Sequence, residues 1–432
     1  MSKIIFKNSI KNIKGSVSVP GSKSYTNRAL ILAALTKGSV TLLNPLFSDD
    51  VDAMLSCLTT LGIHCTRQKD RIIVSGDISD VKEDIYKLNA RFSGTTIRFI
   101  LALSVLIPGV KIISGEKSLN TRPIKVLVDG LRQLGAKIEY LDKHGYPPLK
   151  VTYRSLTKKF IKLDGGVSSQ YFSALLMIGP CMGGINIKVI GSQISKPYVD
   201  MTADTMLQFG VSVLNKNYHT YVVKSGKQYR KRSYMVEGDF SSAGYFFAIA
   251  VLTKSKITVR NLNPNSKQAD TRFLRILENM GNKVLYGKNS VTITGFSLKN
   301  VTVNMEDCPD QAQTLAVLVS FVKGKSIIRG VRSLRIKETE RVVALEKELK
   351  KMGIETHSTL DMLTIYGGIP KTAIIDTYND HRMAMSFAVA GTKLEGMEIL
   401  DPKVVEKTYP DFWKDIRSIG LKLINKQNYA RK

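Results

Sequence analysis

Six copies of one short phrase determine the fold of this chain, and the first copy is LTTLGIH at residues 58–64. Each copy has two apolar residues three positions apart, then a glycine, then residues typical of a β-strand. The other copies read LRQLGAKI at 131–138, MLQFGVSV at 206–213, LENMGNKV at 277–284, LKKMGIET at 349–356 and IRSIGLKL at 416–423. We call the six glycines the marker glycines: Gly62, Gly135, Gly210, Gly281, Gly353 and Gly420. They lie 67 to 75 residues apart, so six repeats fill the 432 residues.

The surroundings of each marker glycine predict the repeating unit. Glycine fits the position just past a helix C-terminus, where a positive φ is needed. In the fifth copy Leu345, Leu349 and Met352 form the apolar face of such a helix. A short strand precedes this surface helix, and a helix that is apolar on nearly all faces, such as ALILAAL at 29–35, precedes the strand. Since two strand-like segments follow most of the glycines, we predict an α/β (α+β) fold of six βαβαββ-type units with buried helices.

The last copy is too short to complete its own strands, because twelve residues follow Gly420. The segment 3–19 reads as strand, and we expect it to complete this last copy. The chain then crosses between domains near Pro20–Gly21 and returns near Gly238–Asp239. We therefore predict two similar domains of three units each, one of residues 1–20 with 239–432 and one of residues 21–238. A single solenoid of six units is the alternative, but a chain well above about 300 residues favours two cores.

Composition narrows the possible partners. The chain has 64 Lys and Arg against 36 Asp and Glu, a formal net charge of +28, which predicts an anionic partner. Charge alone leaves open whether that partner is a nucleic acid, a membrane or a small phosphate. The four cysteines include no C-x-x-C pair, so we expect no disulfide framework and no zinc site. The longest uncharged run, Gly165–Ile187, is interrupted by glycines, and we expect a soluble cytoplasmic protein without a signal peptide or a membrane span.

Cations stand where helices are expected to begin, although a helix N-terminus carries positive partial charge. A bound anion would compensate them, since free N–H groups at a helix start also attract anions. We therefore predict a convergent site for small anions. The cations at these expected openings are Lys23, Arg28, Arg98, Arg122, Lys196, Arg335, Lys337, Arg341, Arg382 and Lys407.

Two carboxylates and a histidine lie near these cations. Glu338 in RIKETER could belong to a salt-bridged exposed helix, or it could donate a proton beside Lys337 and Arg341, which we expect on one face of a helix start. Asp310 in CPDQAQ could be an N-cap or a base. His381 in YNDHRM is expected to be structural or a hydrogen-bond donor. The residues alone leave these alternatives open.

Taken together, these motifs resemble the EPSP synthase family from end to end. The resemblance implies two domains of three similar units that close over a cleft. The segments that carry it are PGSKSYTNRALILAAL, SGTTIRF, RPIKVLVDGLRQLGA, GGVSSQYFSALLM, SKPYVDMT, VEGDFSSAGYF, PDQAQTLAV, RIKETERVVAL, YNDHRMAMSFAVAG and DPKVVEKTYPDFW.

The resemblance implies a reaction in the shikimate pathway, which leads to chorismate and the aromatic amino acids. The enolpyruvyl group of phosphoenolpyruvate moves to the 5-hydroxyl of shikimate 3-phosphate, and phosphate leaves. It implies no redox cofactor, no metal, no nucleic-acid or membrane partner, and a monomer. It places shikimate 3-phosphate on the 21–238 domain, and phosphoenolpyruvate with the catalytic carboxylates on the other.

The resemblance also assigns site residues. It implies catalytic roles for Asp310, which accepts the hydroxyl proton, for Glu338 in proton transfer at the methylene carbon, and for Lys23. The residues implied to bind shikimate 3-phosphate are Lys23, Ser24, Arg28, Ser168, Ser169, Gln170, Ser195, Tyr198, Asp310 and Lys337. Those implied to bind phosphoenolpyruvate are Lys23, Gly94, Arg122, Gln170, Arg341, Arg382 and Lys407.

Three positions depart from the family pattern. Phe92 stands where much of the family has Asn, Ser333–Leu334 replaces an Asn-aromatic pair, and Phe99 stands where many members have Pro. Because these positions flank the implied substrate contacts, sensitivity to glyphosate stays open.

Two alternatives compete with this interpretation. The sister transferase that acts on UDP-N-acetylglucosamine typically has a Cys in the loop before Arg-Pro, where this chain reads GEKSLNTRP at 115–123, and its Lys-Asn opening is Lys-Ser here. A nucleic-acid-end-processing protein of related repeat fold would explain the charge, but it predicts aromatic residues among the basic ones. Aromatic residues make up only 8% of the chain, and many fall in the expected buried helices.

Overall fold

The computed structural model describes residues 2–76, 78, 81–82 and 84–426. The chain divides into two compact units. Unit 1 consists of residues 1–20 and 237–432, and unit 2 of residues 21–236. The crossing expected near Gly238–Asp239 lies two residues beyond the observed division.

Each described sheet repeats one pattern of four strands. A central strand pairs in parallel with an edge strand on one side and antiparallel with a third strand on the other, and the third strand pairs antiparallel with a fourth. The sheets of unit 2 run β14(Ser233–Met235)-β3(Val40–Leu43)-β5(Arg71–Ser75)-β4(His64–Arg67), β6(Ile85–Asn89)-β7(Val110–Ser114)-β9(Leu149–Thr152)-β8(Lys137–Tyr140) and β10(Phe160–Asp164)-β11(Ile185–Ile190)-β13(Thr220–Val223)-β12(Leu214–Lys216). Those of unit 1 run β2(Lys14–Ser18)-β15(Lys256–Arg260)-β17(Ser290–Thr294)-β16(Lys283–Gly287), β18(Thr302–Asn304)-β19(Gly324–Arg329)-β21(Met362–Gly367)-β20(Glu355–Ser358) and β22(Ile374–Ile375)-β23(Glu398–Leu400)-β1(Lys3–Phe6)-β24(Leu423–Lys426).

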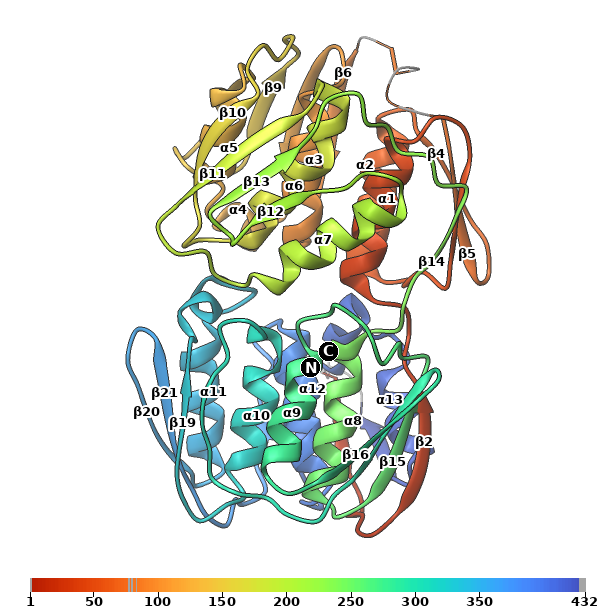
Figure 1. The fold of residues 1–432 in the computed structure, drawn as a ribbon. Helices are drawn as coiled ribbons and strands as arrows, with labels where there is room; N and C mark the ends of the chain where they lie inside the picture. The colour runs from red at the N-terminus through yellow and green to blue at the C-terminus, as the bar shows by residue number, and fades with distance from the viewer. Residues whose placement is uncertain (1, 77, 79–80, 83, 427–432) are drawn as a thin grey trace, which may run out of the picture. The chain divides into compact units, whose positions relative to one another are not determined.

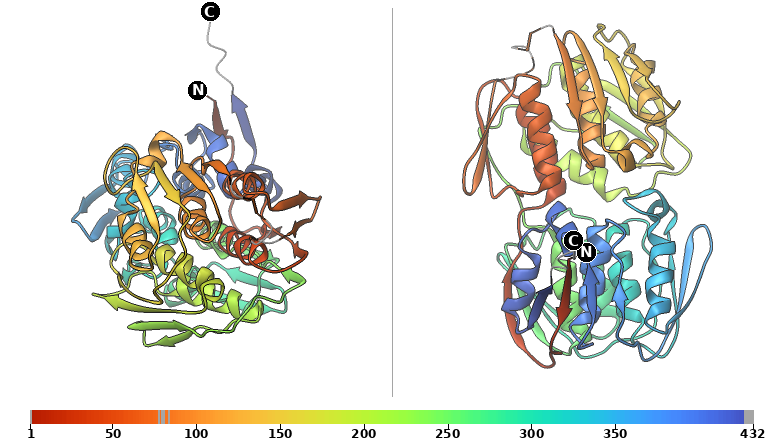
Figure 2. Two further views of the ribbon diagram at one scale, coloured as in Figure 1. Left: turned by 90° about the horizontal axis from the view of Figure 1, so that it is seen from above. Right: turned by 180° about the vertical axis from the view of Figure 1, so that it is seen from behind.

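The N-terminal segment splits between two of these sheets. As predicted, β1 completes the sheet of the last copy, where it lies beside β24 (Figure 2). The expectation that all of residues 3–19 belongs to that copy is wrong, because β2 pairs in parallel with β15 in the sheet of the fourth copy. An edge strand precedes each buried helix, and at the two crossings that strand stays in the unit the chain is leaving. β2 therefore precedes α1 of unit 2, and β14 precedes α8 of unit 1.

Helices that are buried on nearly all faces form the centre of each unit, as predicted. In α8 twelve of thirteen residues are buried. Within unit 1, α8, α10 and α12 pack against one another between the β19–β21 and β15–β17 sheets (Figure 1). The buried helices are α1(Lys23–Ala34), α3(Gly94–Ser104) and α6(Ser169–Ile178) in unit 2, and α8(Phe240–Leu252), α10(Ala312–Val319) and α12(His381–Gly391) in unit 1.

The marker glycines end the surface helices as predicted. Each follows the residue that caps such a helix, and each has a positive φ, from 77° at Gly353 to 108° at Gly135. The apolar face predicted from Leu345, Leu349 and Met352 is fully buried. These helices are α2(Asp49–Thr60), α5(Lys125–Gln133), α7(Pro197–Gln208), α9(Thr271–Asn279), α11(Arg341–Lys351) and α13(Phe412–Ser418). Shorter helices are α4(Lys117–Asn120) and the 3₁₀ helices η2(Gly179–Met182), η3(Pro309–Gln311), η4(Arg332–Ile336) and η5(Pro402–Lys407).

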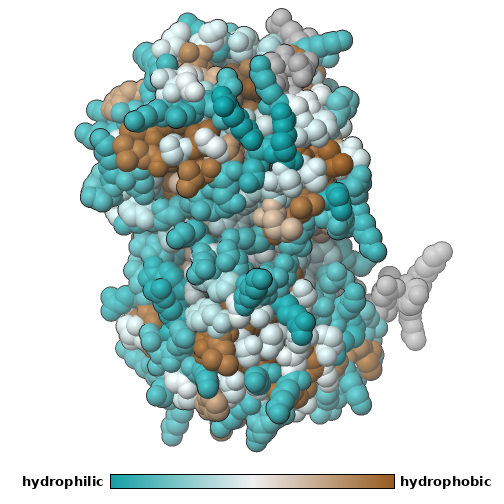
Figure 3. All heavy atoms as spheres, turned by 45° about the vertical axis from the view of Figure 1, so that its right-hand side comes forward, coloured by the Kyte–Doolittle hydropathy of each residue, from teal (hydrophilic) through white to brown (hydrophobic). Residues whose placement is uncertain are grey.

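The face drawn in Figure 3 is mainly hydrophilic, and its apolar side chains gather in separate patches. Among the described residues, no helix has both the length and the apolar character needed to cross a membrane.

Candidate functional site

The predicted site residues of unit 1 lie at the beginnings of helices and in the loops before them. Arg341 is the first residue of α11, and Arg382 is the second residue of α12. Asp310 lies in η3, directly before α10, where Gln311 occupies the N-cap position, so the N-cap interpretation of Asp310 is wrong. Lys407 ends η5 rather than opening a helix, because Pro410 disfavours helical backbone at the residue before it and α13 begins only at Phe412.

The expectation that Lys337 and Arg341 share a helix face is also wrong. Glu340 is the N-cap of α11, and its carboxylate accepts a hydrogen bond from the backbone N–H of Val343. The helix therefore begins at Arg341. Lys337 lies in the non-helical segment that follows η4.

Arg341 is the centre of a buried ion-pair network. Its side chain is 2% exposed, and its Nε donates to Asp380 Oδ2 at 2.7 Å. Its other nitrogens donate to Glu338 Oε2 at 2.8 Å and to Asp310 Oδ1 at 3.4 Å. Asp380 is itself fixed, because it is fully buried and caps α12 through the backbone N–H of Arg382. The network thus holds Glu338 and Asp310, the two predicted catalytic carboxylates, against one guanidinium group.

Each of these carboxylates has a second cation. Arg382 Nη2 donates to Asp310 Oδ2 at 2.7 Å, and Arg382 Nη1 donates to the Asp310 carbonyl at 3.2 Å. Lys407 Nζ donates to Glu338 Oε1 at 3.0 Å. Glu338 and Lys407 are 12% and 11% exposed at their side chains, so the pair is largely withdrawn from solvent. Two carboxylates in different surroundings can serve opposite proton-transfer steps.

Asp270, which the sequence did not single out, adds a further carboxyl group to this region. It is buried at the start of α9. Burial and the nearby charge of Asp310 raise the pKa of Asp270 to about 7, against the opposing charge of Arg382.

Lys23 is the first residue of α1 in unit 2, as predicted. Its Nζ donates to Asp50 Oδ2 at 3.1 Å. Asp50 is buried in the first turn of α2. Lys23 retains 17% exposure at its side chain, so this ion pair borders solvent.

Arg28 is a buried cation held by neutral groups. It is 2% exposed, and its Nε donates to Thr202 Oγ1 at 2.7 Å. Its other nitrogens donate to Ser173 Oγ at 3.3 Å and to the carbonyls of Ser24 and Tyr198 at 2.9 and 3.0 Å. Among the described residues no carboxylate pairs with it, and burial lowers the pKa of Arg28 to about 10. The side chain therefore fixes the backbone at two predicted substrate-binding residues.

The first turn of α3 brings together Gly94, Gln170 and two further arginines. Arg98 Nη1 donates to Gln170 Oε1 at 2.8 Å and to the Gly94 carbonyl at 2.9 Å. A Cβ at Gly94 would lie 2.7 Å from Arg98 Nη1 and 3.2 Å from Arg122 Nη1. Glycine is therefore needed there so that both guanidinium groups can approach the helix start.

The remaining predicted residues of unit 2 lie at two other helix starts. Ser168 caps α6 and accepts from the backbone N–H of Gln170 at 3.3 Å, and Ser169 is the first residue of that helix. Ser195, two residues before α7 begins, has φ of 52°, and its carbonyl accepts from the backbone N–H of Tyr198.

Several side chains that contact the predicted site residues of the two units were not predicted as site residues from the sequence. Arg98 stood among the opening cations but outside the predicted binding set, and Asp380 lay one residue from His381 in YNDHR. A cap signal, Asp directly before the buried helix, could have found Asp380. Asp270 also stands directly before a helix, α9, although its side chain makes no cap hydrogen bond, and Asp50 lies inside the first turn of α2, where it gives no cap signal. His381 is buried beside Asp380, in line with a structural role, with 3.7 Å between Nδ1 and Oδ1.

All three departures from the family pattern have clear positions, and Ser333–Leu334 lies in η4. Phe92 is 53% exposed before α3, and Phe99 is buried in α3 with the Arg28 guanidinium 5.6 Å from its ring centre. No group of three His, Cys, Asp or Glu side chains that could hold a metal ion occurs in the part of the chain that the structure describes.

Comparisons with known proteins agree with this architecture. A family model described as EPSP synthase (3-phosphoshikimate 1-carboxyvinyltransferase) matches residues 7–416. A curated 3-phosphoshikimate 1-carboxyvinyltransferase from Sulfurovum sp. (strain NBC37-1) is 39% identical over 418 residues, covering 95% of this chain and 98% of that protein. The protein of the same name from Pseudoalteromonas atlantica (strain T6c / ATCC BAA-1087) is 40% identical over 424 residues, covering 96% and 98%.

A solved structure of EPSP synthase from Acinetobacter baumannii shows the same fold. Its TM-score is 0.82 at 23% identity, and the match covers 99% of this chain and all of that one. Fold and matches together define a carboxyvinyltransferase built from two similar units. The chain belongs to the EPSP synthase family, as the resemblance predicted, and the competing interpretations are not favoured.

Proposed function

We propose that this chain transfers the enolpyruvyl group of phosphoenolpyruvate to the 5-hydroxyl of shikimate 3-phosphate and releases phosphate. The observation that carries this proposal is the pair of carboxylates, Asp310 and Glu338, that share Arg341 while each has its own second cation. Transfer of an enolpyruvyl group to a hydroxyl needs one group that removes the hydroxyl proton and one that delivers a proton to carbon, and this pair can supply both.

In the addition step, the methylene carbon of phosphoenolpyruvate gains a proton and positive charge develops at C2. The 5-hydroxyl oxygen attacks C2 and gives up its proton to the Asp310 carboxylate, so a tetrahedral adduct forms. In the elimination step, the C2–O bond to phosphate breaks and a methyl proton returns to a base, which restores the double bond. We assign proton transfer at this carbon to Glu338, with Lys23 close to both substrates.

The cations of unit 1 are assigned to phosphoenolpyruvate. Arg341, Arg382 and Lys407 pair with carboxylates of the protein. The phosphate and carboxylate of phosphoenolpyruvate would share or replace these pairs, so substrate binding and the state of the catalytic carboxylates are coupled. Lys337 is assigned to the shikimate ligand.

The residues of unit 2 are assigned mainly to shikimate 3-phosphate. We assign contacts to Lys23, Ser24, Ser168, Ser169, Gln170, Ser195 and Tyr198, and a positioning role to Arg28 because it bonds to the carbonyls of Ser24 and Tyr198. Its uncompensated charge also favours a nearby anion. Gly94 and Arg122, with Gln170, are assigned to phosphoenolpyruvate.

Release of phosphate tests the proposal. Purified chain should release one phosphate for each phosphoenolpyruvate consumed when shikimate 3-phosphate is present. It should release none with UDP-N-acetylglucosamine as acceptor, and added RNA should leave the rate unchanged. Turnover with the UDP-sugar alone would overturn the assignment.

We further propose that the protein acts as a monomer in the cytoplasm, without a nucleic-acid or membrane partner. Light scattering of the purified chain should give a mass near 48.0 kDa. Cell fractionation should recover it with soluble cytoplasmic enzymes.

A further inference from the structure

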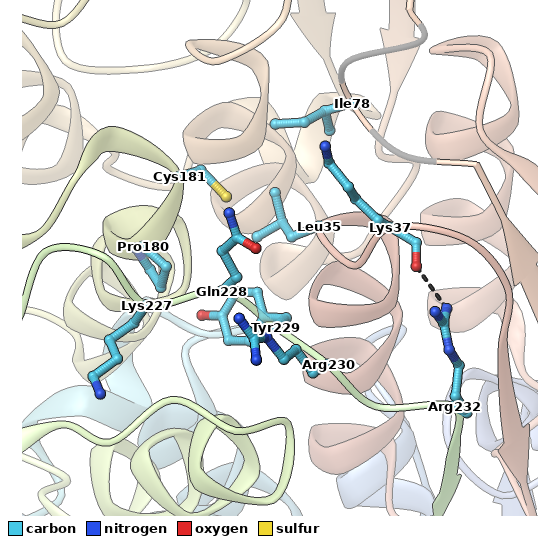
Figure 4. Close-up of a pocket in the computed structure, with 10 residues that line it drawn as sticks. All are labelled: Leu35, Lys37, Ile78, Pro180, Cys181, Lys227, Gln228, Tyr229, Arg230 and Arg232. Carbon is cyan, nitrogen blue, oxygen red and sulfur yellow. Dashed lines mark hydrogen bonds between the residues drawn. The ribbon is translucent and has the colours of Figure 1, made fainter.

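A basic cavity lies in unit 2 at the ends of α1 and α6 opposite to the predicted site residues (Figure 4). Lys23 and Ser169 begin these helices, whereas the cavity is lined by Leu35, just past the end of α1, and by Pro180 and Cys181, just past the end of α6. Since α1 has twelve residues, its two ends lie roughly 18 Å apart. The cavity is therefore separate from the residues assigned to catalysis.

Four cations line this cavity, and no Asp or Glu is among the lining residues that the structure describes. Among the described residues none of the four forms an ion pair, and Arg232 is held by a hydrogen bond from Nη1 to the Lys37 carbonyl at 2.6 Å. Three of the four belong to the segment KSGKQYRKR at 224–232, which has five cations in nine residues. The lining cations are Lys37, Lys227, Arg230 and Arg232.

Helix ends alone do not account for so much positive charge. The C-terminal end of a helix carries about half a negative charge, so the ends of α1 and α6 together would balance about one cation. Four cations therefore leave the described lining of the cavity strongly positive. A bound anion would lower that repulsion.

The cavity has the size and the lining of a small-molecule site. Its volume is about 570 Å³, within the roughly 300–1,000 Å³ typical of ligand pockets. Leu35 and Pro180 are buried and supply apolar surface beside the cations. Among the described lining residues Tyr229 is the one aromatic side chain, and it is 4% exposed and donates to the Met177 carbonyl, so it offers no face for stacking the bases of a nucleic-acid strand.

We propose that this cavity binds a small organic phosphate that carries at least two phosphate groups on a less polar body. The cations contact the phosphates, and the apolar wall covers the rest of the ligand. This inference is independent of the function proposed for the other ends of these helices.

Cys181 provides a local reporter of binding, because it is exposed at the cavity. The test measures the rate at which neutral iodoacetamide alkylates Cys181 in the whole chain, read by mass spectrometry of its peptide. The probe is adenosine triphosphate without divalent metal. Saturating probe should slow alkylation of Cys181 severalfold, and alkylation of Cys65, on β4 of the same unit, should be unaffected.

A pair of matched double variants tests the role of the cations. Lys37→Gln with Lys227→Gln should weaken protection by about tenfold, because charge-assisted hydrogen bonds to phosphate are lost. Arg232 is kept, so its bond to the Lys37 backbone remains. Lys188→Gln with Lys216→Gln removes two exposed lysines of the same unit outside the cavity and should leave protection unchanged.

Three results would overturn the proposal: no protection by adenosine triphosphate, equal weakening in both double variants, or protection by a DNA oligonucleotide alone. Inorganic tripolyphosphate should protect at a higher concentration than adenosine triphosphate, because it cannot use the apolar wall. Equal potency of the two probes would contradict the role given to that wall. Unchanged steady-state turnover and melting temperature in the cavity variant will show that it is folded.

Discussion

The two units share one repeat but treat their buried cations in opposite ways. In unit 1, Arg341 and Arg382 are bonded to carboxylates of the protein. In unit 2, Arg28 is equally buried, but its partners among the described residues are hydroxyls and carbonyls. The same frame therefore supports a charge-balanced network in one unit and an unbalanced cation in the other.

This difference separates two uses of positive charge. A cation already paired with a carboxylate can orient that carboxylate and shift its pairing when substrate arrives. A buried cation with neutral partners favours an anion supplied by a ligand. We infer that unit 1 is organised for proton transfer and unit 2 for anion binding.

The largest expected effect comes from removing the charge of Asp310 in the balanced network. Asp310→Asn should lower kcat by about a thousandfold with little change in KM, since it removes a general base. Steady-state phosphate release measures both constants. Asp307→Asn is the matched control, because that carboxylate pairs with Arg272 near the surface, and it should keep normal turnover. A raised KM with unchanged kcat for Asp310→Asn would rule out the base.

A second prediction compares the two buried arginines directly. Arg341→Met should cost about 4 kcal/mol of stability, because it leaves Asp380 buried without its partner. Arg28→Met should cost about 1 kcal/mol, since lost neutral hydrogen bonds are offset by relief of an unpaired buried charge. Denaturant unfolding of both variants measures the two losses. If the two variants lost the same free energy of unfolding, the contrast between a paired arginine in unit 1 and an unpaired one in unit 2 would be contradicted.

The pH dependence of stability sharpens the description of unit 1. Because the pKa of Asp270 is raised to about 7 in the folded chain from 3.8, its contribution to stability is fully present below pH 3.8 and is lost as pH rises to about 7. In the variant Asp270→Asn, the side-chain amide does not titrate in this pH range. The stability of the variant relative to the wild type should therefore rise by about 4 kcal/mol between pH 4 and pH 8. Unfolding midpoints at pH 4, 6 and 8 measure the gap, and a gap independent of pH would contradict the raised pKa.

The smallest effect should be the same in both units, because it concerns the shared repeat. Gly62 and Gly420 have φ of 86° and 101°, and a Cβ at either would meet no atom closer than 3.9 Å. Replacement of either by Ala should cost about 1–2 kcal/mol from backbone conformation alone. Thermal unfolding of the two variants measures this. A much larger loss for one of them would show that the repeats are not equivalent.

The sequence predicted the repeat well because its signals are local. A marker glycine after an apolar helix face, such as Gly353 after Leu349 and Met352, specifies a helix end wherever it lies. The partner of β2 was not predictable in this way, because a short alternating strand does not indicate which sheet it joins.

The candidate site could be predicted in part for the same reason. Lys23, Arg28 and Arg382 stand in local motifs, but their partners depend on tertiary structure. Arg28 and Thr202 are 174 residues apart, and Arg341 and Asp380 are 39 apart. Lys407 was expected at the start of a helix, but Pro410 follows it and α13 begins only at Phe412.

The strands β1 and β2 belong to different sheets of unit 1, so the order of synthesis determines when each of them can pair. All strands and helices of unit 2 come from one continuous stretch, so this unit can fold once residue 236 has been made. β1 must wait for β23, which begins at Glu398, or roughly 20–80 s at 5–20 residues per second. During that time β1 is an unpaired strand edge, where strand-to-strand aggregation begins, whereas β2 waits only for β15, which begins at Lys256. The β1 strand thus finds its partners only after the whole of unit 2 has been made.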